Sequence, residues 1–249
     1  MQKYGQHFLI DAHIIAQIVD AACLLRAENV VEIGPGKGAL TRALAARGVP
    51  LTAVEIDPDM VRHLRENLPA GVCVVEQNFL EFDLAALPPV PTEFVSNLPY
   101  IDAAAILDKV LGWVHFKTAV FMFQKEQAQK IRAQVGDEWY GPLSIFSQLR
   151  ARISPVCKVG RSSFAPPPKV ESAVLAFEKI TPPQGDWGKL RRVVTAAFLH
   201  RRKTLLNALM LSGYEKEEIT SALAALGVLP TARPEQLTPK QYAELTLHW

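Results

Sequence analysis

The sequence predicts an α/β protein in which a doubly wound parallel sheet is followed by a small helical domain. Short apolar runs alternate with amphipathic stretches through most of the chain, and a glycine-rich turn, residues 34–38, follows the first run. No strand pattern follows residues 182–185 (PPQG). Strands that alternate with helices in this way are typical of a parallel sheet with helices on its faces.

The elements can be assigned in order from their periodicity. Apolar runs predict strands at residues 29–33, 51–55, 72–76, 93–96, 118–124 and 172–178. Amphipathic patterns predict the intervening helices at residues 39–47, 58–68, 103–114, 125–134 and 143–152. Further helices are expected at residues 190–199, 204–210, 216–226 and 239–248. We therefore expect a larger domain at residues 1–181 and a helical domain at residues 186–249.

The composition is that of a globular protein with an uneven charge distribution. Apolar residues make up 49% of the chain, but no long uninterrupted apolar run exists, so we expect neither a secretory leader nor a membrane span. The three cysteines are far apart, which predicts a cytoplasmic protein without disulfides or a metal site. Residues 150–203 hold twelve Lys or Arg and three Asp or Glu, whereas the remainder holds 15 and 22. This favours a polyanionic partner such as nucleic acid, although a solvated basic face is the alternative.

A nucleoside-binding site is predicted where the first two strands end. In residues 32–38 (EIGPGKG), Gly34 and Gly36 let a ligand approach the backbone, and the following helix offers free N–H groups. Glu55 ends the second strand, where a carboxylate can accept hydrogen bonds from ribose hydroxyls. Asn78 follows the third strand and can bind an adenine amino group. The G-x-G-x-G spacing differs from the dinucleotide fingerprint and favours S-adenosylmethionine.

The fourth strand leads into Asn97-Leu98-Pro99-Tyr100, which suits a target adenine. The exocyclic N6 of adenine is a weak nucleophile because its lone pair is delocalised into the ring. The Asn97 amide oxygen and the Leu98 carbonyl can accept its two hydrogens, while Pro99 stiffens the loop and Tyr100 stacks on the base. Such a base has to be flipped out of its helix. Phe164, which precedes three prolines, is a candidate to cover the other face of the base, or alternatively a core residue.

These motifs together resemble the ribosomal RNA adenine dimethyltransferase family, in particular its bacterial small-subunit branch. The resemblance covers nearly the whole chain: residues 5–11, 32–41, 97–100, 124–126, 140–141, 164–172, 201–207 and 233–237. It implies a Rossmann-like class I methyltransferase sheet, and cofactor contacts from His7, Leu9, Gly34, Gly36, Glu55, Asn78 and Asn97. It also implies dimethylation, without a metal, of two adjacent adenosines near the 3′ end of small-subunit (16S) rRNA during ribosome assembly. The sequence itself gives no sign of oligomerisation, so we expect a monomer. Lys169, Arg201, Arg202 and Lys203 are the expected phosphate contacts.

Three alternatives share part of this pattern. A large-subunit (23S) rRNA methyltransferase of the macrolide-resistance type has the same cofactor and base motifs, but residues 201–207 and 233–237 argue against it. An RNA-binding assembly factor with little catalysis is suggested by two departures from the family, Asn78 in place of Asp and Asp102 after the base motif. A DNA adenine methyltransferase would need a larger recognition domain than residues 186–249 provide.

Overall fold

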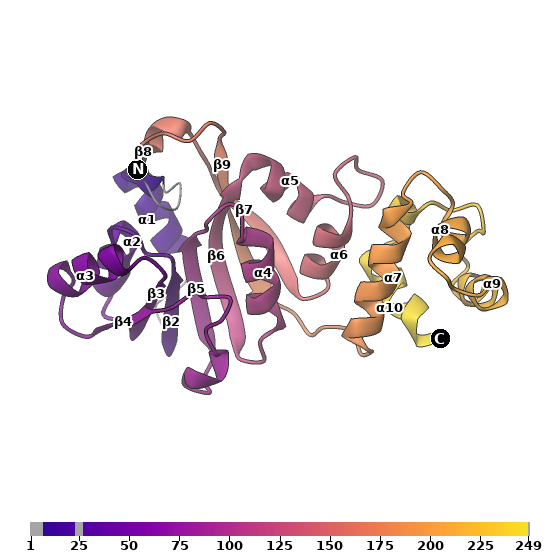
Figure 1. The fold of residues 1–249 in the computed structure, drawn as a ribbon, viewed down its shortest axis with the longest axis horizontal. Coiled ribbons are helices and arrows are strands. Elements are labelled where there is room, and N and C mark those ends of the chain that lie inside the picture. Colours follow the sequence, from indigo (N-terminus) through magenta and orange to yellow (C-terminus); the bar gives the residue numbers. More distant parts are fainter. Residues whose placement is uncertain (1–6, 23–26, 249) are drawn as a thin grey trace. The chain divides into compact units, whose positions relative to one another are not determined.

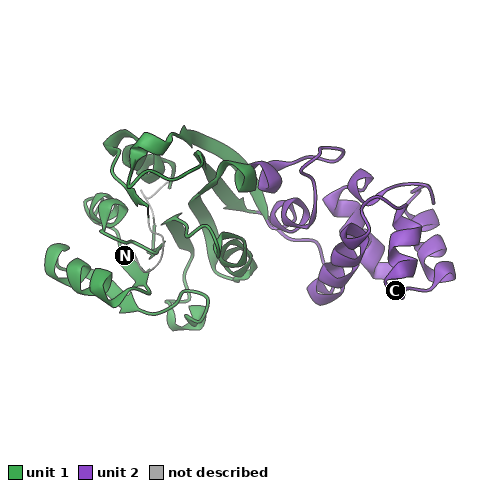
Figure 2. Ribbon diagram, turned by 45° about the horizontal axis from the view of Figure 1, so that its top comes forward, with its two compact units in different colours: residues 1–128, 151–179 green, residues 129–150, 180–249 purple. Residues whose placement is uncertain are grey.

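The computed structural model describes residues 7–22 and 27–248 and divides the chain into two compact units (Figures 1 and 2). Unit 1 is formed by residues 1–128 and 151–179, and unit 2 by residues 129–150 and 180–249. The sequence prediction placed residues 129–150 in the larger domain. The structure assigns them to unit 2, because Tyr140, Ile145 and Leu149 are buried in the apolar core of that unit.

A seven-stranded sheet with strand order β4-β3-β2-β5-β6-β9-β7 forms the centre of unit 1. The first five strands in this order are parallel, and β9 and β7 are added antiparallel. Their bounds are β2 Asn29–Ile33, β3 Leu51–Glu55, β4 Val72–Glu76, β5 Thr92–Asn97, β6 Phe116–Gln124, β7 Ala151–Val159 and β9 Ser172–Lys179. All five residues of β2 are buried, as expected for a central parallel strand that is covered on both faces.

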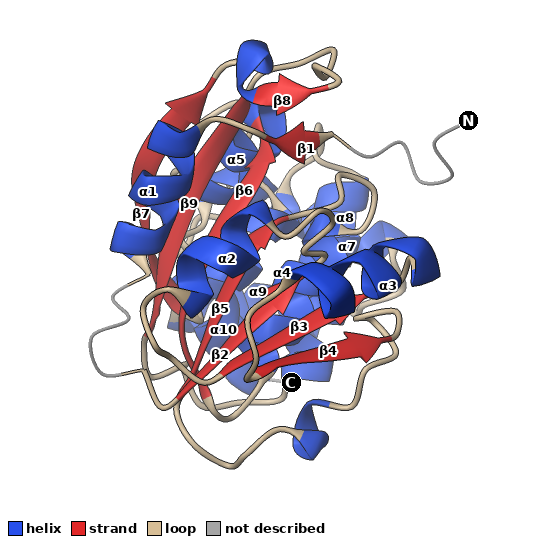
Figure 3. Ribbon diagram, turned by 90° about the vertical axis from the view of Figure 1, so that its left-hand side faces the viewer, coloured by secondary structure: helices blue, strands red, loops and turns tan. Residues whose placement is uncertain are grey.

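Helices cover both faces of this sheet. Three of them, α1 (Ala12–Ala21), α2 (Ala39–Ala45) and α3 (Pro58–Asn67), lie on one face, and α4 (Ala103–Gly112) lies on the other (Figures 1 and 3). Local chemistry fixes where they begin. The Asp57 carboxylate accepts the Asp59 N–H at 3.0 Å, and proline occupies the first position of α3. The turn between β3 and α3 therefore has a defined conformation.

A short antiparallel pair lies beside the main sheet. It joins β1 (Phe8–Leu9) to β8 (Phe164–Ala165), with Leu9 opposite Phe164. Both residues are buried in an apolar cluster with Val30, Val95 and Val174. This pairing brings the amino-terminal segment against the carboxyl ends of the parallel strands.

Unit 2 is helical. Helix α5 (Lys125–Arg132) runs from unit 1 into it, and it contains α6 (Pro142–Gln148), α7 (Trp187–Leu199), α8 (Leu205–Leu211), α9 (Lys216–Ala225) and α10 (Pro239–Leu245). Its core contains Val193, Leu209 and Leu223, all fully buried, together with Tyr140 and Tyr242. Both tyrosine hydroxyls donate to backbone carbonyls, of Leu237 and Pro234 respectively, each at 2.8 Å. Burial raises the pKa of Tyr140, so this hydroxyl stays protonated and keeps its bond.

Among the α-helices and strands of the described residues, the sequence prediction missed α1, β1, β7 and β8. The predicted helix at residues 143–152 ends at Gln148, and β7 begins at Ala151. This strand contains Pro155 next to an irregularity in its pairing with β9. A proline is tolerated there because β7 is at the edge of the sheet, but it disguises the strand in the sequence.

Within the described ranges, no helix is long and apolar enough to cross a bilayer. Nor do residues 7–22 and 27–248 contain a group of three His, Cys, Asp or Glu that could hold a metal ion. Cys73 and Cys157 are free thiols, and Cys23 lies outside the described residues.

Candidate active site

A cavity of about 590 Å³ opens in unit 1 where the parallel strands β2, β3, β4 and β5 end. The carboxyl ends of parallel strands meet at one edge of a sheet, which is where such folds bind their ligands. All seven residues expected to contact the cofactor line this cavity: His7, Leu9, Gly34, Gly36, Glu55, Asn78 and Asn97. Leu98, Pro99 and Tyr100 line it too. The structure thus brings the predicted cofactor and base motifs together in one cavity.

The glycine loop has a conformation that only glycine adopts easily. Gly36 has φ +56°, and a Cβ placed on it would lie 3.1 Å from Cε1 of Phe8. Phe8 therefore packs directly on the loop, and the Lys37 ammonium lies 4.6 Å from the centre of the same ring. Gly34 has φ +63°, and a Cβ there would meet nothing within 4 Å. This open side faces the cavity and gives a ligand room to approach the backbone.

Glu55 fixes the loop from the end of β3. Its carboxylate accepts the N–H of Gly36, of Ile56 and of Asp57, each at 2.9 Å. The side chain is only 3% exposed, and this burial raises its pKa despite the three hydrogen bonds. Glu55 is thus held rigidly, with a carboxylate edge at the cavity wall.

Glu32 is a site residue that the sequence prediction did not include. It is the fourth residue of β2, lines the cavity and is 1% exposed. Burial raises its pKa to about 8. Its Oε2 finds no hydrogen-bond partner in the described part of the chain. An acidic residue inside the otherwise apolar run of residues 29–33 was the available signal.

Asn78 is held by its own loop after β4. Its Oδ1 accepts the Leu80 N–H at 3.0 Å, and its Nδ2 lies 3.3 Å from Oε1 of Glu81. Phe79 follows it, buried, with its ring against those of Phe82 and Phe94. The loop therefore contributes two polar residues to the cavity lining, Asn78 and Gln77, and the packed aromatic rings support it.

The base motif lines the same cavity at the end of β5, the strand next to β2 in the sheet. Asn97 Nδ2 donates to the His7 carbonyl at 3.2 Å, which orients the amide. The Tyr100 hydroxyl lies 3.2 Å from Oγ of Ser172, and its ring centre is 6.1 Å from that of His7. His7 is itself fixed by a 2.9 Å contact between its Nδ1 and the Pro166 carbonyl. The amino-terminal segment thus helps to position the motif.

The structure does not bring Phe164 to this cavity, contrary to its prediction as a catalytic residue. Its side chain is 3% exposed and belongs to the apolar cluster beneath the β1–β8 pair. Apolar burial explains the aromatic residue fully. Two residues that the prediction did not list as site residues occupy the rim instead: Ile101, which is 96% exposed, and Asp102, which is also exposed.

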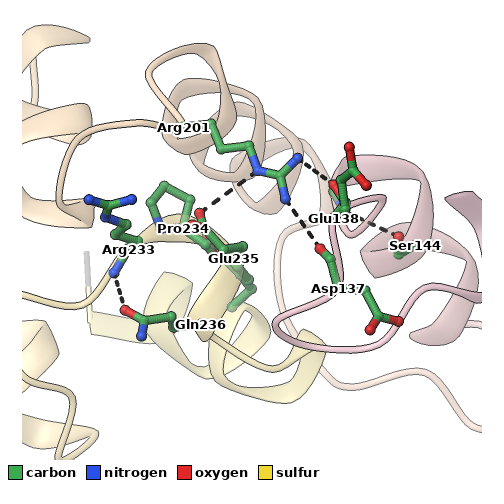
Figure 4. Close-up of polar contacts among 10 residues, drawn as sticks. Asp137, Glu138, Ser144, Arg201, Arg233, Pro234, Glu235 and Gln236 are labelled. Carbon is green, nitrogen blue, oxygen red and sulfur yellow. Dashed lines mark hydrogen bonds and ion pairs between the residues drawn. The ribbon is translucent and has the colours of Figure 1, made fainter.

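The expected phosphate contacts differ in how they are used. Lys169 in unit 1 is exposed, as are Arg202 and Lys203 in unit 2. Arg201 is engaged internally: it donates to the carbonyls of Glu138 at 2.6 Å and Asp137 at 3.2 Å, and its Nε lies 3.9 Å from Oε2 of Glu235 (Figure 4). The Arg201 guanidinium thus links two loops of unit 2, which departs from its expected role as an RNA contact.

The sheet topology and the position of the cavity are those of a class I methyltransferase, so the predicted fold class is confirmed. A dimethyladenosine transferase from Plasmodium falciparum superimposes with a TM-score of 0.82 at 27% identity, over 97% of this chain and 96% of that one. The 23S rRNA methyltransferase ErmE gives a TM-score of 0.72 at 32% identity, over 97% and 98%.

The sequence comparisons narrow this class to a family. Residues 1–248 match the family described as ribosomal RNA adenine dimethylase, and the chain belongs to it. It is 40% identical over 250 residues to ribosomal RNA small subunit methyltransferase A of Myxococcus xanthus, covering 98% of this chain and 88% of that protein. The Rubrobacter xylanophilus protein of the same name is also 40% identical, with coverage of 98% and 93%. The resemblance inferred from the motifs is confirmed.

Proposed function

We propose that this protein transfers methyl groups from S-adenosylmethionine to N6 of two adjacent adenosines near the 3′ end of small-subunit rRNA. The observation that carries the proposal is that the residues expected to bind the cofactor and the oriented Asn97 amide line one cavity. Relatives named for the small ribosomal subunit, at 36–40% identity over nearly the whole chain, support that subunit as the substrate.

The cavity residues fit this cofactor. Glu55 and Asn78 both line the cavity, and we expect Glu55 to accept a ribose hydroxyl and Asn78 to bind the adenine amino group. Glu32 and Glu55 are two buried carboxyls at the cavity wall, and Glu32 retains an unsatisfied oxygen. Burial raises the pKa of both carboxyls, and a bound positive charge would favour their ionised form and so offset that cost. When bound, S-adenosylmethionine supplies an electrophilic methyl group on a sulfonium cation.

The chain contributes orientation and electrostatics to the reaction. Because Asn97 Nδ2 is bound by the His7 carbonyl, its Oδ1 is the atom offered to the target amino group. Oδ1 and the Leu98 carbonyl would accept the two N6 hydrogens, which favours a tetrahedral nitrogen with a localised lone pair. Tyr100, tied to Ser172, would stack on the flipped base. No strong base is required, since the proton can leave to solvent after transfer.

The test is to incubate the purified protein with methyl-labelled S-adenosylmethionine and undermethylated small subunits, with large subunits and naked rRNA in parallel. Nuclease digestion then identifies the labelled nucleoside. We expect N6,N6-dimethyladenosine from small subunits alone. Label only in large-subunit RNA would assign the protein to the resistance type, and cofactor binding without any label would support the assembly-factor alternative.

A variant tests the mechanism directly. Asn97→Ala should lower the methylation rate at least about 100-fold, because it removes one acceptor aimed at the reacting nitrogen. Affinity for the small subunit, measured by filter binding, should change less than about twofold, since phosphate contacts elsewhere dominate it. Unchanged turnover in this variant would contradict the mechanism.

A further inference from the structure

Lys109 on α4 reaches the loop that carries Asn78. Its Nζ lies 2.8 Å from the Phe79 carbonyl, 2.9 Å from that of Leu80 and 2.6 Å from that of Phe82. An ammonium group has three donors, and here all three are directed at one short segment. Lys109 therefore acts on the conformation of residues 79–82, and the carboxylate of Asp83, the next residue of the chain, lies near enough to interact with its charge.

This segment forms the wall next to the expected adenine. The N–H groups of Glu81 and Phe82 both bond to the Asn78 carbonyl, each at 3.0 Å, so the loop closes on itself. That closure turns several carbonyls to the same side, where their dipoles repel one another. A cation among them offsets the repulsion, and the Lys109 ammonium also lies 5.3 Å from the centre of the Phe79 ring.

The helix that carries Lys109 is held in place by buried side chains. Helix α4 begins at Ala103, three residues after Tyr100, so it continues directly from the base motif. Its own residues Ala103, Ile106 and Val110 are buried, at no more than 2% exposure. Lys109 thus ties the adenine-side loop to the element that supports the target-base side of the same cavity.

We propose that Lys109 is a positioning residue that holds residues 78–82 in the conformation that binds the adenine of the cofactor. The identity of that ligand rests on the proposed function. The ammonium does not line the cavity; it acts through the loop that does. Removing the Lys109 ammonium should weaken the binding of adenosine-containing ligands and leave the rate of the methyl-transfer step unchanged.

The test compares Lys109→Met, which keeps the apolar stem, with Lys109→Arg, which keeps the charge. We expect Lys109→Met to raise the Kd of S-adenosylhomocysteine about tenfold by titration calorimetry, through loss of three charge-assisted hydrogen bonds. The KM for S-adenosylmethionine should rise to a similar degree, with kcat within about twofold of the wild type. Lys109→Arg should recover most of the affinity.

A second lysine of unit 1 provides a matched control. Lys117 lies near the start of β6 and pairs with the buried Glu93 at 3.2 Å, so Lys117→Met should also lower stability. It does not line the cavity and should leave the Kd unchanged. An equal loss of affinity in both variants would overturn the proposal, because it would reflect stability alone.

Hydrogen exchange separates this proposal from the proposed function. In the ligand-free full chain, Lys109→Met should speed amide exchange at residues 80–82 and leave β6 unaffected. If the wild type binds no S-adenosylhomocysteine, the proposed function fails, and the exchange result alone decides the role of Lys109. Unchanged exchange in that loop, or an unchanged Kd where the wild type binds, would overturn the proposal.

Discussion

Glu55 illustrates how one side chain serves both the fold and a ligand. A carboxylate offers about four acceptor positions, and three of them are taken by the N–H groups of Gly36, Ile56 and Asp57. The position that remains is on Oε2, which suffices for one ribose hydroxyl. A second hydroxyl would compete with the Gly36 amide. Ligand binding and the shape of the glycine loop are therefore coupled through this residue.

Glu32 makes stability depend on pH. Its pKa rises from 4.5 to about 8 on folding, so the folded state holds a proton that the unfolded state loses. Stability from this source is fully present below pH 4.5 and declines as pH rises towards 8, by at most about 1.4 kcal/mol per unit. Glu32→Gln resembles the protonated form and cannot titrate. We therefore expect the stability of this variant not to show the decline with rising pH that Glu32 causes.

The measurement is the melting temperature of each protein by calorimetry between pH 5 and pH 8.5. The variant should melt increasingly above the wild type as pH rises. Two parallel profiles would show that Glu32 titrates at the same pH in both states.

At the scale of the element, the glycine loop depends on its packing partner. Gly36→Ala combines a positive φ with a Cβ 3.1 Å from Phe8, whereas Gly48→Ala has a positive φ but no atom within 4 Å. Both should lower stability by about 1 kcal/mol through backbone strain. Only Gly36→Ala should also displace Phe8 and raise the Kd of S-adenosylhomocysteine, by about tenfold.

Thermal unfolding and ligand calorimetry on both variants check this. Gly48→Ala is the control for strain, since residue 48 lies outside the cavity lining. Equal ligand affinities in the two variants would show that Phe8 does not support the loop.

The elements also show what sequence reasoning can reach. Residues 29–33, 51–55 and 72–76 were predicted with the bounds that β2, β3 and β4 have, because each is a run of apolar residues between turn signals. The site residues at the ends of these strands could be predicted because the carboxyl ends of parallel strands meet at one edge of a sheet. Strand β7 was missed because it contains Pro155 and because only its two end residues are buried, so it lacks the apolar pattern of a central strand. For Phe164 the sequence left two interpretations open, because a loop motif cannot distinguish a buried ring from one that faces a ligand, and the structure favours the core residue.

At the scale of the whole molecule, three segments distant in sequence converge inside unit 2. Tyr140 donates to the Leu237 carbonyl, and Gly136 donates to the Glu235 carbonyl at 3.0 Å. Arg201 contacts both segments, through the Glu138 carbonyl and the Glu235 carboxylate. The sequence marked residues 140–141, 201–207 and 233–237 as family motifs without revealing that they meet. The residues predicted to contact RNA in unit 2 therefore divide into Arg201, which holds the unit together, and Arg202 and Lys203, which remain exposed.

This division leads to opposite expectations for neighbouring residues. Arg201→Met removes two hydrogen bonds to carbonyls and leaves Glu235 without its cation, so it should lower the stability of unit 2 by about 1–2 kcal/mol. Arg202→Ala and Lys203→Ala alter exposed side chains and should leave the melting temperature unchanged. Each should instead weaken small-subunit binding and reduce its dependence on salt by about one phosphate contact.

Filter binding at several salt concentrations, with calorimetry of the same proteins, distinguishes the two roles. A reduced salt dependence with an unchanged melting temperature in Arg201→Met would show that this guanidinium binds phosphate after all.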